Sequence, residues 1–244
     1  MSRRRITVAG SIAAALVFML WVRLGPLPPG LLDVEGDVST TVVDRNGAVL
    51  YESRAADGTR GAWLREDVLP PHLVSATIAA EDHRFFSHPG VDPMATARAA
   101  VRNLREGAFV EGGSTITQQV AKLLLARIDA GAPGKRSLRS KIREAVVALR
   151  LEHRLEKREI LTLYLNLAPY GNQIQGAERA SRAYFGAPAA LLTPAQAAFV
   201  AGLPQRPSRF NPFRNTAAAL ARQKQVLDRM ARLGLVSPAA MADA

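Results

Sequence analysis

Residues 111–122 read EGGSTITQQVAK, and this stretch determines how the chain around it folds. Thr115 and Gln118 stand three residues apart, which is the spacing of a capping box at the start of a helix. Ile116 and Val120 open an apolar stripe at helical spacing. The stretch therefore predicts a helix that begins beside flexible glycine backbone and packs one side against a core.

The opposite side of this predicted helix is polar. It carries, at helical spacing, Thr115, Gln118, Gln119 and Lys122. Packing accounts for the apolar stripe but does not require two adjacent glutamines, so we expect the polar side to face a ligand. Because free backbone amides and the helix dipole favour negative charge at a helix N-terminus, an anionic ligand fits this position.

Much of the remaining chain shows the same helical pattern. Apolar spacing predicts helices at 73–81, 115–126, 138–155, 157–167, 194–201 and 217–230. Thr193 and Gln196 form a second capping box. The exception is the segment 38–52, where two β-prone runs flank Asn46-Gly47 and predict a β-hairpin. The sequence thus predicts a mainly α domain with a small N-terminal β-hairpin.

The composition excludes several classes of protein. Of the 244 residues, 48% are hydrophobic and 22% charged, which excludes a disordered chain and fits one domain with a sizeable core. The chain has no cysteine, so disulfide scaffolds, thiol nucleophiles and iron–sulfur clusters are excluded. Its four histidines form no obvious metal-ligand cluster.

The net charge of +11 is unevenly distributed. Residues 35–100 carry six basic and ten acidic side chains, whereas residues 101–165 carry thirteen and seven. A protein that coats nucleic acid would carry basic side chains along a whole face with aromatics among them, yet only 6% of the residues in the whole chain are aromatic. We therefore expect no nucleic-acid partner, which leaves a membrane surface or a phosphorylated substrate.

The N-terminus has the features of a membrane anchor. Three arginines at residues 3–5 precede the uncharged run Ile6–Val22, whose 17 residues are near the minimum that spans a bilayer. Trp21 and Arg23 stand where interface anchors are expected. A cleavable signal peptide is the alternative, but residues 25–30 offer no A-x-A-like cleavage site. The basic N-terminal flank predicts a cytoplasmic N-terminus.

A second polar cluster lies at residues 80–93, which read AEDHRFFSHPGVDP. One interpretation makes Glu81 a general base or acid, held where an apolar helix meets a loop. The other is a polar helix end followed by a Pro-Gly turn, and the residues alone do not choose between them. A metal site built on His83 and His88 is disfavoured, because their spacing to the nearby aspartates is irregular.

A third cluster combines five cations with one carboxylate. The cations are Lys135, Arg136, Arg139, Lys141 and Arg143. Such a run is usually a solvated helix face. Here Glu144 follows directly within the cationic group, which favours its ionised form and suits a phosphate-bearing site. The helix predicted at 157–167 is better explained by packing.

Taken in order, these segments resemble the peptidoglycan glycosyltransferase domain, glycosyltransferase family 51, of class A penicillin-binding proteins. The resemblance covers residues 38–235 and is closest to the penicillin-binding protein 1C type. It rests on EDxxFxxHxGxD at 81–92, GGSTITQQxxK at 112–122, KIREA at 141–145, ILxxYLN at 160–166 and AGLPQ at 201–205. The chain departs from the family pattern at Leu123, at Ser140 and in the lengthened loop 127–134.

The resemblance implies a lysozyme-like fold that polymerises lipid II into β-1,4-linked glycan strands and releases undecaprenyl pyrophosphate. It implies that Glu81 takes the proton from the acceptor 4-hydroxyl and that Glu144 assists departure of the donor pyrophosphate. The substrate-binding positions carried over are Asp82, Phe85, His88, Ser114, Thr115, Gln118, Gln119, Lys122, Arg136, Lys141, Arg143 and Asn166. No cofactor is required by the sequence, although a divalent cation, Mg²⁺ or Mn²⁺, is compatible with the resemblance.

The same resemblance sets the expected organisation and partners. We expect a cytoplasmic tip and anchor at 1–24, a linker at 25–37, the glycosyltransferase domain at 38–235 and a tail at 236–244, with the catalytic domain periplasmic on the inner membrane. Expected partners are lipid II, the growing glycan strand, membrane lipids and a cell-wall transpeptidase. The chain itself contains neither Ser-x-x-Lys nor Lys-Thr-Gly, so no transpeptidase site is expected in it. A lysozyme-like enzyme that cleaves peptidoglycan and a catalytically silent lipid II-binding scaffold are the alternatives.

Overall fold

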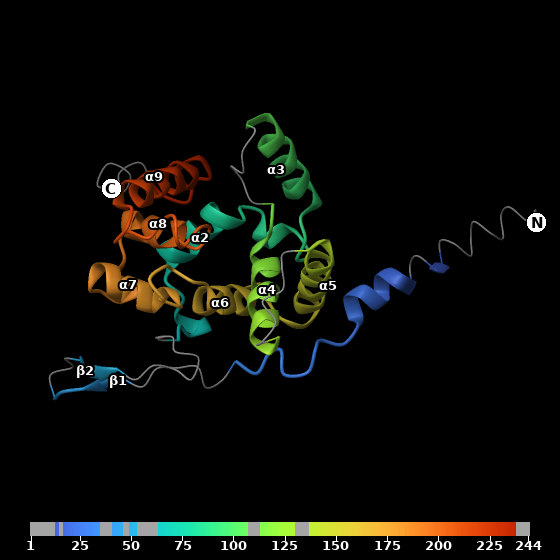
Figure 1. Ribbon diagram of the computed structural model, residues 1–244, viewed down its shortest axis with the longest axis horizontal. Helices are drawn as coiled ribbons and strands as arrows, with labels where there is room; N and C mark the ends of the chain where they lie inside the picture. Colours follow the sequence, from blue (N-terminus) through green and yellow to red (C-terminus); the bar gives the residue numbers. More distant parts are fainter. Residues whose placement is uncertain are drawn as a thin grey trace, which may run out of the picture.

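The computed structural model describes residues 13–14, 17–34, 41–45, 49–52, 63–106, 113–129 and 137–237. In this part the chain is mainly helical, which confirms the predicted fold class (Figure 1). The helices are α2 (Pro71–Glu81), α3 (Pro93–Glu106), α4 (Ile116–Ile128), α5 (Leu138–Arg154), α6 (Lys157–Leu167), α7 (Ala177–Phe185), α8 (Pro194–Gly202) and α9 (Thr216–Arg232). Short 3-10 turns lie at Glu66–Val68, Phe85–Ser87 and Ala189–Leu191. Whether the fold is lysozyme-like stays a prediction.

Two short strands pair near the N-terminal side of the domain. Strand β1 (Thr41–Val43) runs antiparallel to β2 (Val49–Glu52), with an irregular register between Val42 and Val43. The pair lies at the edge of the molecule, away from α4 and α5 (Figure 1). The predicted turn at Asn46-Gly47 falls outside the described residues, so the complete hairpin stays a prediction.

The observed helix boundaries follow the sequence signals closely. Each of the six predicted helices begins and ends within two residues of its expected bounds. The capping box at Thr115 is present, because its side chain accepts from the Gln118 backbone N–H while the Gln118 side chain accepts from the Thr115 N–H. The box at Thr193 is also present. Helices α3 and α7 were not predicted.

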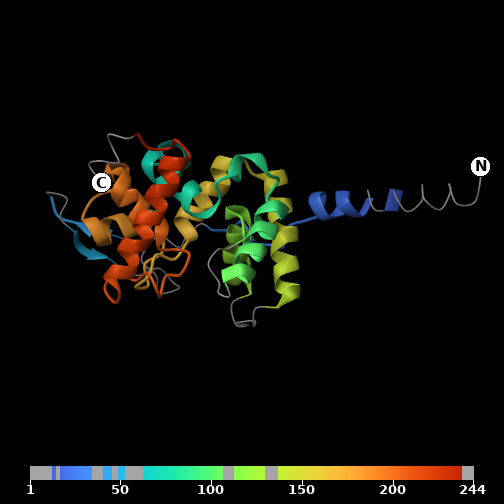
Figure 2. The same cartoon turned by 90° about the horizontal axis from the view of Figure 1, so that it is seen from above.

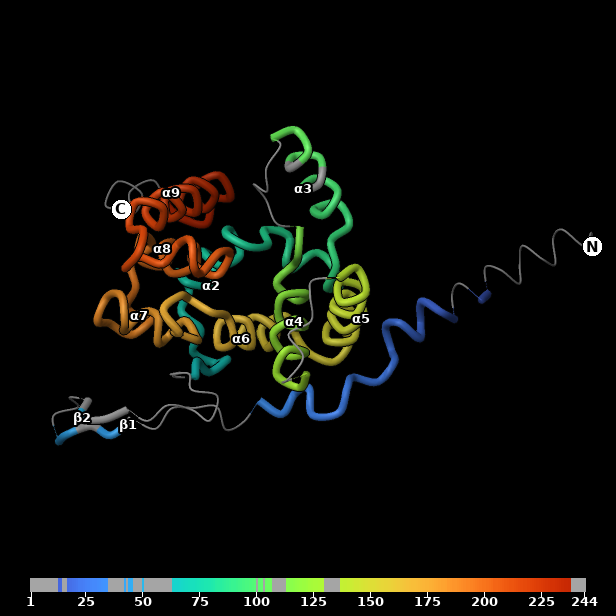
Figure 3. The backbone as a smooth tube through the Cα atoms, viewed as in Figure 1, coloured from blue at the N-terminus to red at the C-terminus, as the bar shows by residue number. Residues whose placement is uncertain are grey.

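The helices form two groups that meet at the ends of α2 and α4. In one group α2 packs against α8 and α9, and in the other α4 packs against α5 and α6. The tube view shows α6 beside α4 and extending toward α7 (Figure 3). Helix α2 buries Ala76, Ala79 and Ala80, whose small side chains let α8 and α9 approach closely. A hydrogen bond from Gln119 on α4 to Glu81 on α2 joins the groups.

Residues 17–24 are helical and extend away from the domain beside α5, at the end opposite α9 (Figures 1 and 2). Within the described ranges, none of the helices has the length and apolar character needed to cross a bilayer. Because residues 6–12 and 15–16 fall outside those ranges, the predicted anchor stays a prediction.

The chain that follows this N-terminal helix is fixed to α5. Arg150 donates from Nε to the Val22 carbonyl at 3.1 Å and from Nη1 to the Pro26 carbonyl at 2.7 Å. Arg154 Nη2 donates to the Gly25 carbonyl at 2.7 Å. A Cβ at position 25 would lie 2.4 Å from Arg150 Nη2 and 2.7 Å from the Trp21 carbonyl oxygen, so a side chain there would force this contact to shift.

Candidate active site

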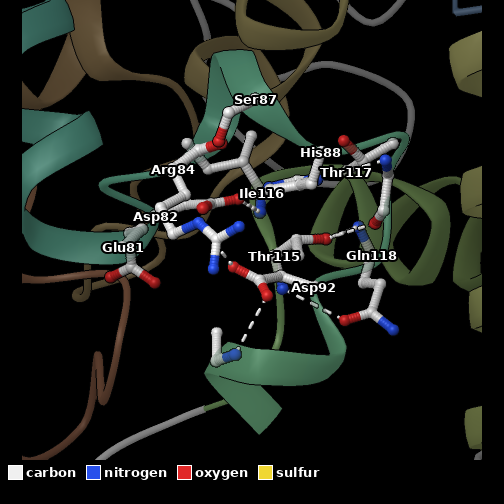
Figure 4. Close-up of polar contacts among 12 residues, drawn as sticks. Glu81, Asp82, Arg84, Ser87, His88, Asp92, Thr115, Ile116, Thr117 and Gln118 are labelled. Carbon is white, nitrogen blue, oxygen red and sulfur yellow. Dashed lines mark hydrogen bonds and ion pairs between the residues drawn. The ribbon is translucent and has the colours of Figure 1, made fainter.

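Glu81 is the last residue of α2 and lies where the two helix groups meet. Its Oε2 atom accepts a hydrogen bond from Gln119 Nε2 at 2.7 Å. Its Oε1 atom is buried and has no hydrogen-bond partner in the described part of the chain. In Figure 4 the Glu81 carboxyl points away from the neighbouring Asp82–His88 pair. The carboxyl thus has one fixed oxygen and one oxygen left for another group.

The surroundings of Glu81 shift its proton affinity. Burial raises the pKa of its carboxyl above the ordinary value, and the neighbouring Asp82 acts in the same direction. The Gln119 hydrogen bond opposes this shift, as do the charges of Arg222 and Arg229. A carboxyl whose pKa lies closer to neutrality is better suited to proton transfer than an exposed one. This favours the catalytic interpretation of Glu81 over that of a polar helix end.

Asp82 links the end of α2 to the start of α4. Its Oδ2 atom accepts from His88 Nε2 at 2.9 Å and from the Ile116 backbone N–H at 3.1 Å. The Gly90 N–H donates to His88 Nδ1 at 3.2 Å, which leaves the proton on Nε2. Asp82 and His88 are both buried. These contacts, some of which Figure 4 draws, give both residues a structural role, and their contact with substrate stays a prediction.

Three other predicted site residues have similar internal contacts. Phe85 is fully buried and the Lys157 ammonium lies 4.5 Å from the centre of its ring. Thr115 Oγ1 donates to the Gly90 carbonyl at 2.6 Å in addition to capping α4. Gln118 is buried and belongs to the same capping box, so Gln119 rather than Gln118 is the glutamine that reaches Glu81. Contact of Phe85, Thr115 and Gln118 with substrate stays a prediction.

Glu144 lies on α5 within a separate polar group. Its Oε2 atom pairs with Lys141 Nζ at 3.0 Å, and the same ammonium donates to Ser114 Oγ at 2.7 Å. Ser114 directly precedes the first residue of the α4 capping box. The beginning of α4 therefore contacts both carboxylates, Glu144 through Ser114 and Lys141, and Glu81 through Gln119.

The remaining predicted cations differ in whether another side chain already pairs with their charge. Lys122 is exposed on α4, one turn after Gln119. Arg143 forms an exposed ion pair with Asp129, at the end of α4. Arg136 falls outside the described residues, so its role stays a prediction. Asn166 is buried, and its side-chain amide accepts from the Leu64 N–H at 2.7 Å and donates to the Leu64 carbonyl at 2.9 Å. These bonds support the local structure, and contact of Asn166 with substrate stays a prediction.

The sequence interpretation missed residues on two helices. Arg222 and Arg229 of α9 and Tyr164 of α6 surround Glu81 and interact electrostatically with it or with each other. A signal was available for Arg222, because it stands on the stripe formed by Ala219, Val226 and Met230. A charged residue on an apolar stripe indicates a buried role, whereas only a helix had been predicted at 217–230.

No metal centre is evident in the described ranges, where no group of three or more His, Asp or Glu side chains is arranged to hold an ion. The described side chains thus offer no protein-ligand set for Mg²⁺ or Mn²⁺, and we assign no step to a metal.

Comparison with known proteins identifies the family of this chain. Residues 46–231 match the family described as Transglycosylase. Penicillin-binding protein 1C of Escherichia coli is 43% identical over 231 residues, which cover 92% of this chain and 28% of that protein. The Biosynthetic peptidoglycan transglycosylase of Nitrosospira multiformis is 37% identical over 182 residues, covering 75% of this chain and 76% of that protein.

A solved structure, penicillin-binding protein 1A from Haemophilus influenzae, aligns over 86% of this chain and 20% of that one, with 20% identity and a TM-score of 0.46. The chain thus spans less than a third of penicillin-binding protein 1C but most of the shorter Nitrosospira protein. The family match and the sequence identities confirm the resemblance drawn from the motifs, and the chain belongs to the transglycosylase family.

Proposed function

We propose that this chain is a peptidoglycan glycosyltransferase that polymerises lipid II into β-1,4-linked glycan strands and releases undecaprenyl pyrophosphate. The observation that carries the proposal is the pair of carboxylates held in different surroundings by the start of α4. Glu81 is enclosed and its pKa is raised, whereas Glu144 lies against the Lys141 ammonium. Family membership supports the same reaction class.

The two surroundings suit the two halves of an inverting glycosyl transfer. Glu81 takes the proton from the 4-hydroxyl of the acceptor sugar, and that oxygen forms the new bond to C1 of the donor. The bond between C1 and the pyrophosphate oxygen breaks with its electron pair, so negative charge grows on the leaving group. Cations stabilise this charge better than an acid does, and the described candidates include Lys141 on α5, which pairs with Glu144, and the exposed Lys122 on α4.

The test is polymerisation of lipid II by the purified chain in detergent. We expect a ladder of glycan products, and a loss of about hundredfold or more in rate for Glu81→Gln, the range expected for removing a general base. Glu106→Gln, at the exposed end of α3, is the matched control and should keep the parent rate. A Glu81→Gln variant that polymerises as fast as Glu106→Gln removes Glu81 from the mechanism.

The alternative with a specific observation in its favour is cleavage of peptidoglycan. A buried glutamic acid with raised pKa also serves as the general acid of a lysozyme-like hydrolase. Release of soluble fragments from purified sacculi, without polymer from lipid II, would establish this activity instead. Binding of lipid II with no turnover on either substrate would establish a scaffold. Repeating the polymerisation assay with EDTA, then with Mg²⁺ or Mn²⁺, tests the expected divalent cation.

We further propose that the chain is a single-pass protein of the inner membrane with a cytoplasmic N-terminus and a periplasmic catalytic domain. Supporting this, the helical residues 17–24 expose Phe18, Leu20 and Trp21, large apolar side chains that water would not favour. A cell-wall transpeptidase is the expected protein partner. Reporter fusions after residue 24 and at the C-terminus test the topology, and activity of a periplasmic reporter is the expected result.

A further inference from the structure

Two arginines of α9 converge on the backbone immediately before Glu81. Arg222 Nη2 donates to the Ala80 carbonyl at 3.2 Å, and Arg229 Nη1 donates to the same carbonyl at 3.4 Å. The two arginines are seven residues apart and therefore share one face of α9. The last turn of α2 has no basic residue of its own. Helix α9 thus supplies the positive charge that complements the C-terminal end of α2.

Arg222 lies in an enclosed space between α9, α8 and α2. Its side chain is buried, with 3% of the residue exposed, and its Nε has no hydrogen-bond partner among the described residues. Gly202 of α8 makes room for it, because a Cβ at position 202 would lie 2.9 Å from Arg222 Cγ. The absence of a side chain at Gly202 therefore determines the path of the arginine toward α2.

A buried guanidinium stays charged and needs a compensating anion. Asp82 is close in sequence, but its Oδ2 atom is engaged by His88 and by the Ile116 N–H. Glu81 has a buried oxygen, Oε1, without a partner. Burial lowers the pKa of Arg222, and the attraction of the Glu81 carboxylate opposes that shift. Glu81 is therefore the carboxylate whose charge acts on the Arg222 guanidinium.

The charges around Glu81 come from every element packed near it. The carboxylate of Asp82, the next residue, repels that of Glu81, and His83 follows Asp82 in the chain. The groups on other elements are Gln119 on α4, Tyr164 on α6, Tyr170 just after α6, and Arg222 and Arg229 on α9. Helix α8, which also packs against α2, carries no ionisable residue. Within this set the positive charge that favours an ionised Glu81 comes from α9.

We propose that Arg222, seated in the space left by Gly202 and assisted by Arg229, is a positioning residue that holds Glu81 and keeps its carboxylate ionised to accept a proton. The inference rests on the proposed function, because it takes Glu81 as the base of the transfer reaction.

The test compares Arg222→Met with Arg232→Met, which removes the same charge from an exposed position on the same helix. A base acts when deprotonated, so loss of a nearby cation moves the acidic limb of the pH profile of kcat/KM upward. We expect a shift of about one pH unit in Arg222→Met, with the rate above the limb recovering to within about threefold of the parent, and no shift in Arg232→Met. A uniform loss of activity at every pH, with the limb unmoved, would show a merely structural role.

Two milder variants keep the inference testable if Arg222→Met does not fold. Arg222→Lys retains the charge and should restore the limb to within about 0.3 units of the parent. Gly202→Ala displaces the Arg222 side chain without changing any charge, and should move the limb upward by a smaller amount. If folded Gly202→Ala has the parent profile and Arg222→Lys has a limb raised by about one unit, the proposal is overturned.

A titration without substrate separates this inference from the proposed function. Carboxyl signals of the ¹³C-labelled protein, with Glu81 assigned from its loss in Glu81→Gln, report the Glu81 midpoint directly. An upward midpoint shift in Arg222→Met supports the inference even if the parent does not polymerise lipid II. An unchanged midpoint overturns it even if the parent is active.

Discussion

Replacing Asp82 with asparagine distinguishes a structural role from a substrate-binding one. The carboxylate accepts from His88 Nε2 at 2.9 Å and from the Ile116 N–H at 3.1 Å, and its side chain is 5% exposed. In Asp82→Asn an oxygen can still accept both bonds, but the negative charge is lost. The contribution of each hydrogen bond to the free energy of unfolding then falls from about 1.5–3 kcal/mol to about 0.5–1.5 kcal/mol. The two bonds together lose about 2 kcal/mol.

In a chain of this length, a loss of about 2 kcal/mol lowers the midpoint of thermal unfolding by about 4–8 °C. Circular dichroism in detergent measures that midpoint. The matched control is Asp67→Asn, because Asp67 forms an exposed ion pair with Arg65 and should shift the midpoint by less than about 2 °C. Well below the midpoint, KM for lipid II should stay within about twofold of the parent. A variant as stable as the parent whose KM rises about tenfold would refute the structural account and place Asp82 on the substrate.

Three further predictions follow from other contacts. Gly25→Ala would bring a Cβ to 2.4 Å from Arg150 Nη2, so it should disrupt the bonds to Val22 and Pro26 and speed tryptic cleavage after Arg23 by about tenfold. Asn166→Leu leaves the Leu64 N–H and carbonyl without their partner, so the free energy of unfolding in urea should fall by about 2–3 kcal/mol while KM stays unchanged. A raised KM at parent stability would instead indicate that Asn166 contacts the substrate. Because burial raises the folded-state pKa of Glu81, ionisation of this carboxyl at neutral pH destabilises the fold. Glu81→Gln should therefore melt at a higher temperature than the parent at pH 7. This difference should disappear as the pH falls to the ordinary glutamate pKa of 4.5, where the parent carboxyl is protonated.

The helices that the sequence predicted well are those whose signals are local. Helix α6 was predicted at Lys157–Leu167 and has those bounds, because its apolar spacing is regular and Pro169 follows its end. Helix α4 was placed by its capping box, and all atoms of that box lie within residues 115–118. Such signals depend on neighbouring residues alone, so no knowledge of the tertiary structure is needed to interpret them.

Helix α3 was missed because its signal is weak in apolar residues. Its sequence, PMATARAAVRNLRE, is rich in alanine and arginine, and Met94, Val101 and Leu104 are exposed. The start was nevertheless marked, since Asp92 Oδ1 accepts from the Ala95 N–H at 3.0 Å and Pro93 is the first helical residue. That Asp-Pro pair had not been interpreted as the start of a helix.

The surroundings of the candidate site could not be predicted for a related physical reason. Glu81 and Glu144 were chosen as candidates from their neighbouring residues and from the family resemblance, but their surroundings depend on contacts between distant segments. Arg222 approaches Ala80 from 142 residues away, and no local pattern on α2 indicates that a cation is needed there. Likewise, the choice between Gln118 and Gln119 depends on where α2 ends relative to α4.

The start of α4 sets the relation between the two halves of the proposed site. Ser114 accepts from the Lys141 ammonium that pairs with Glu144, and Gln119 donates to Glu81. Since the capping box and the Asp82 bond to the Ile116 N–H fix this segment against α2, one rigid turn links the side proposed to accept the proton to the side proposed to stabilise the leaving group.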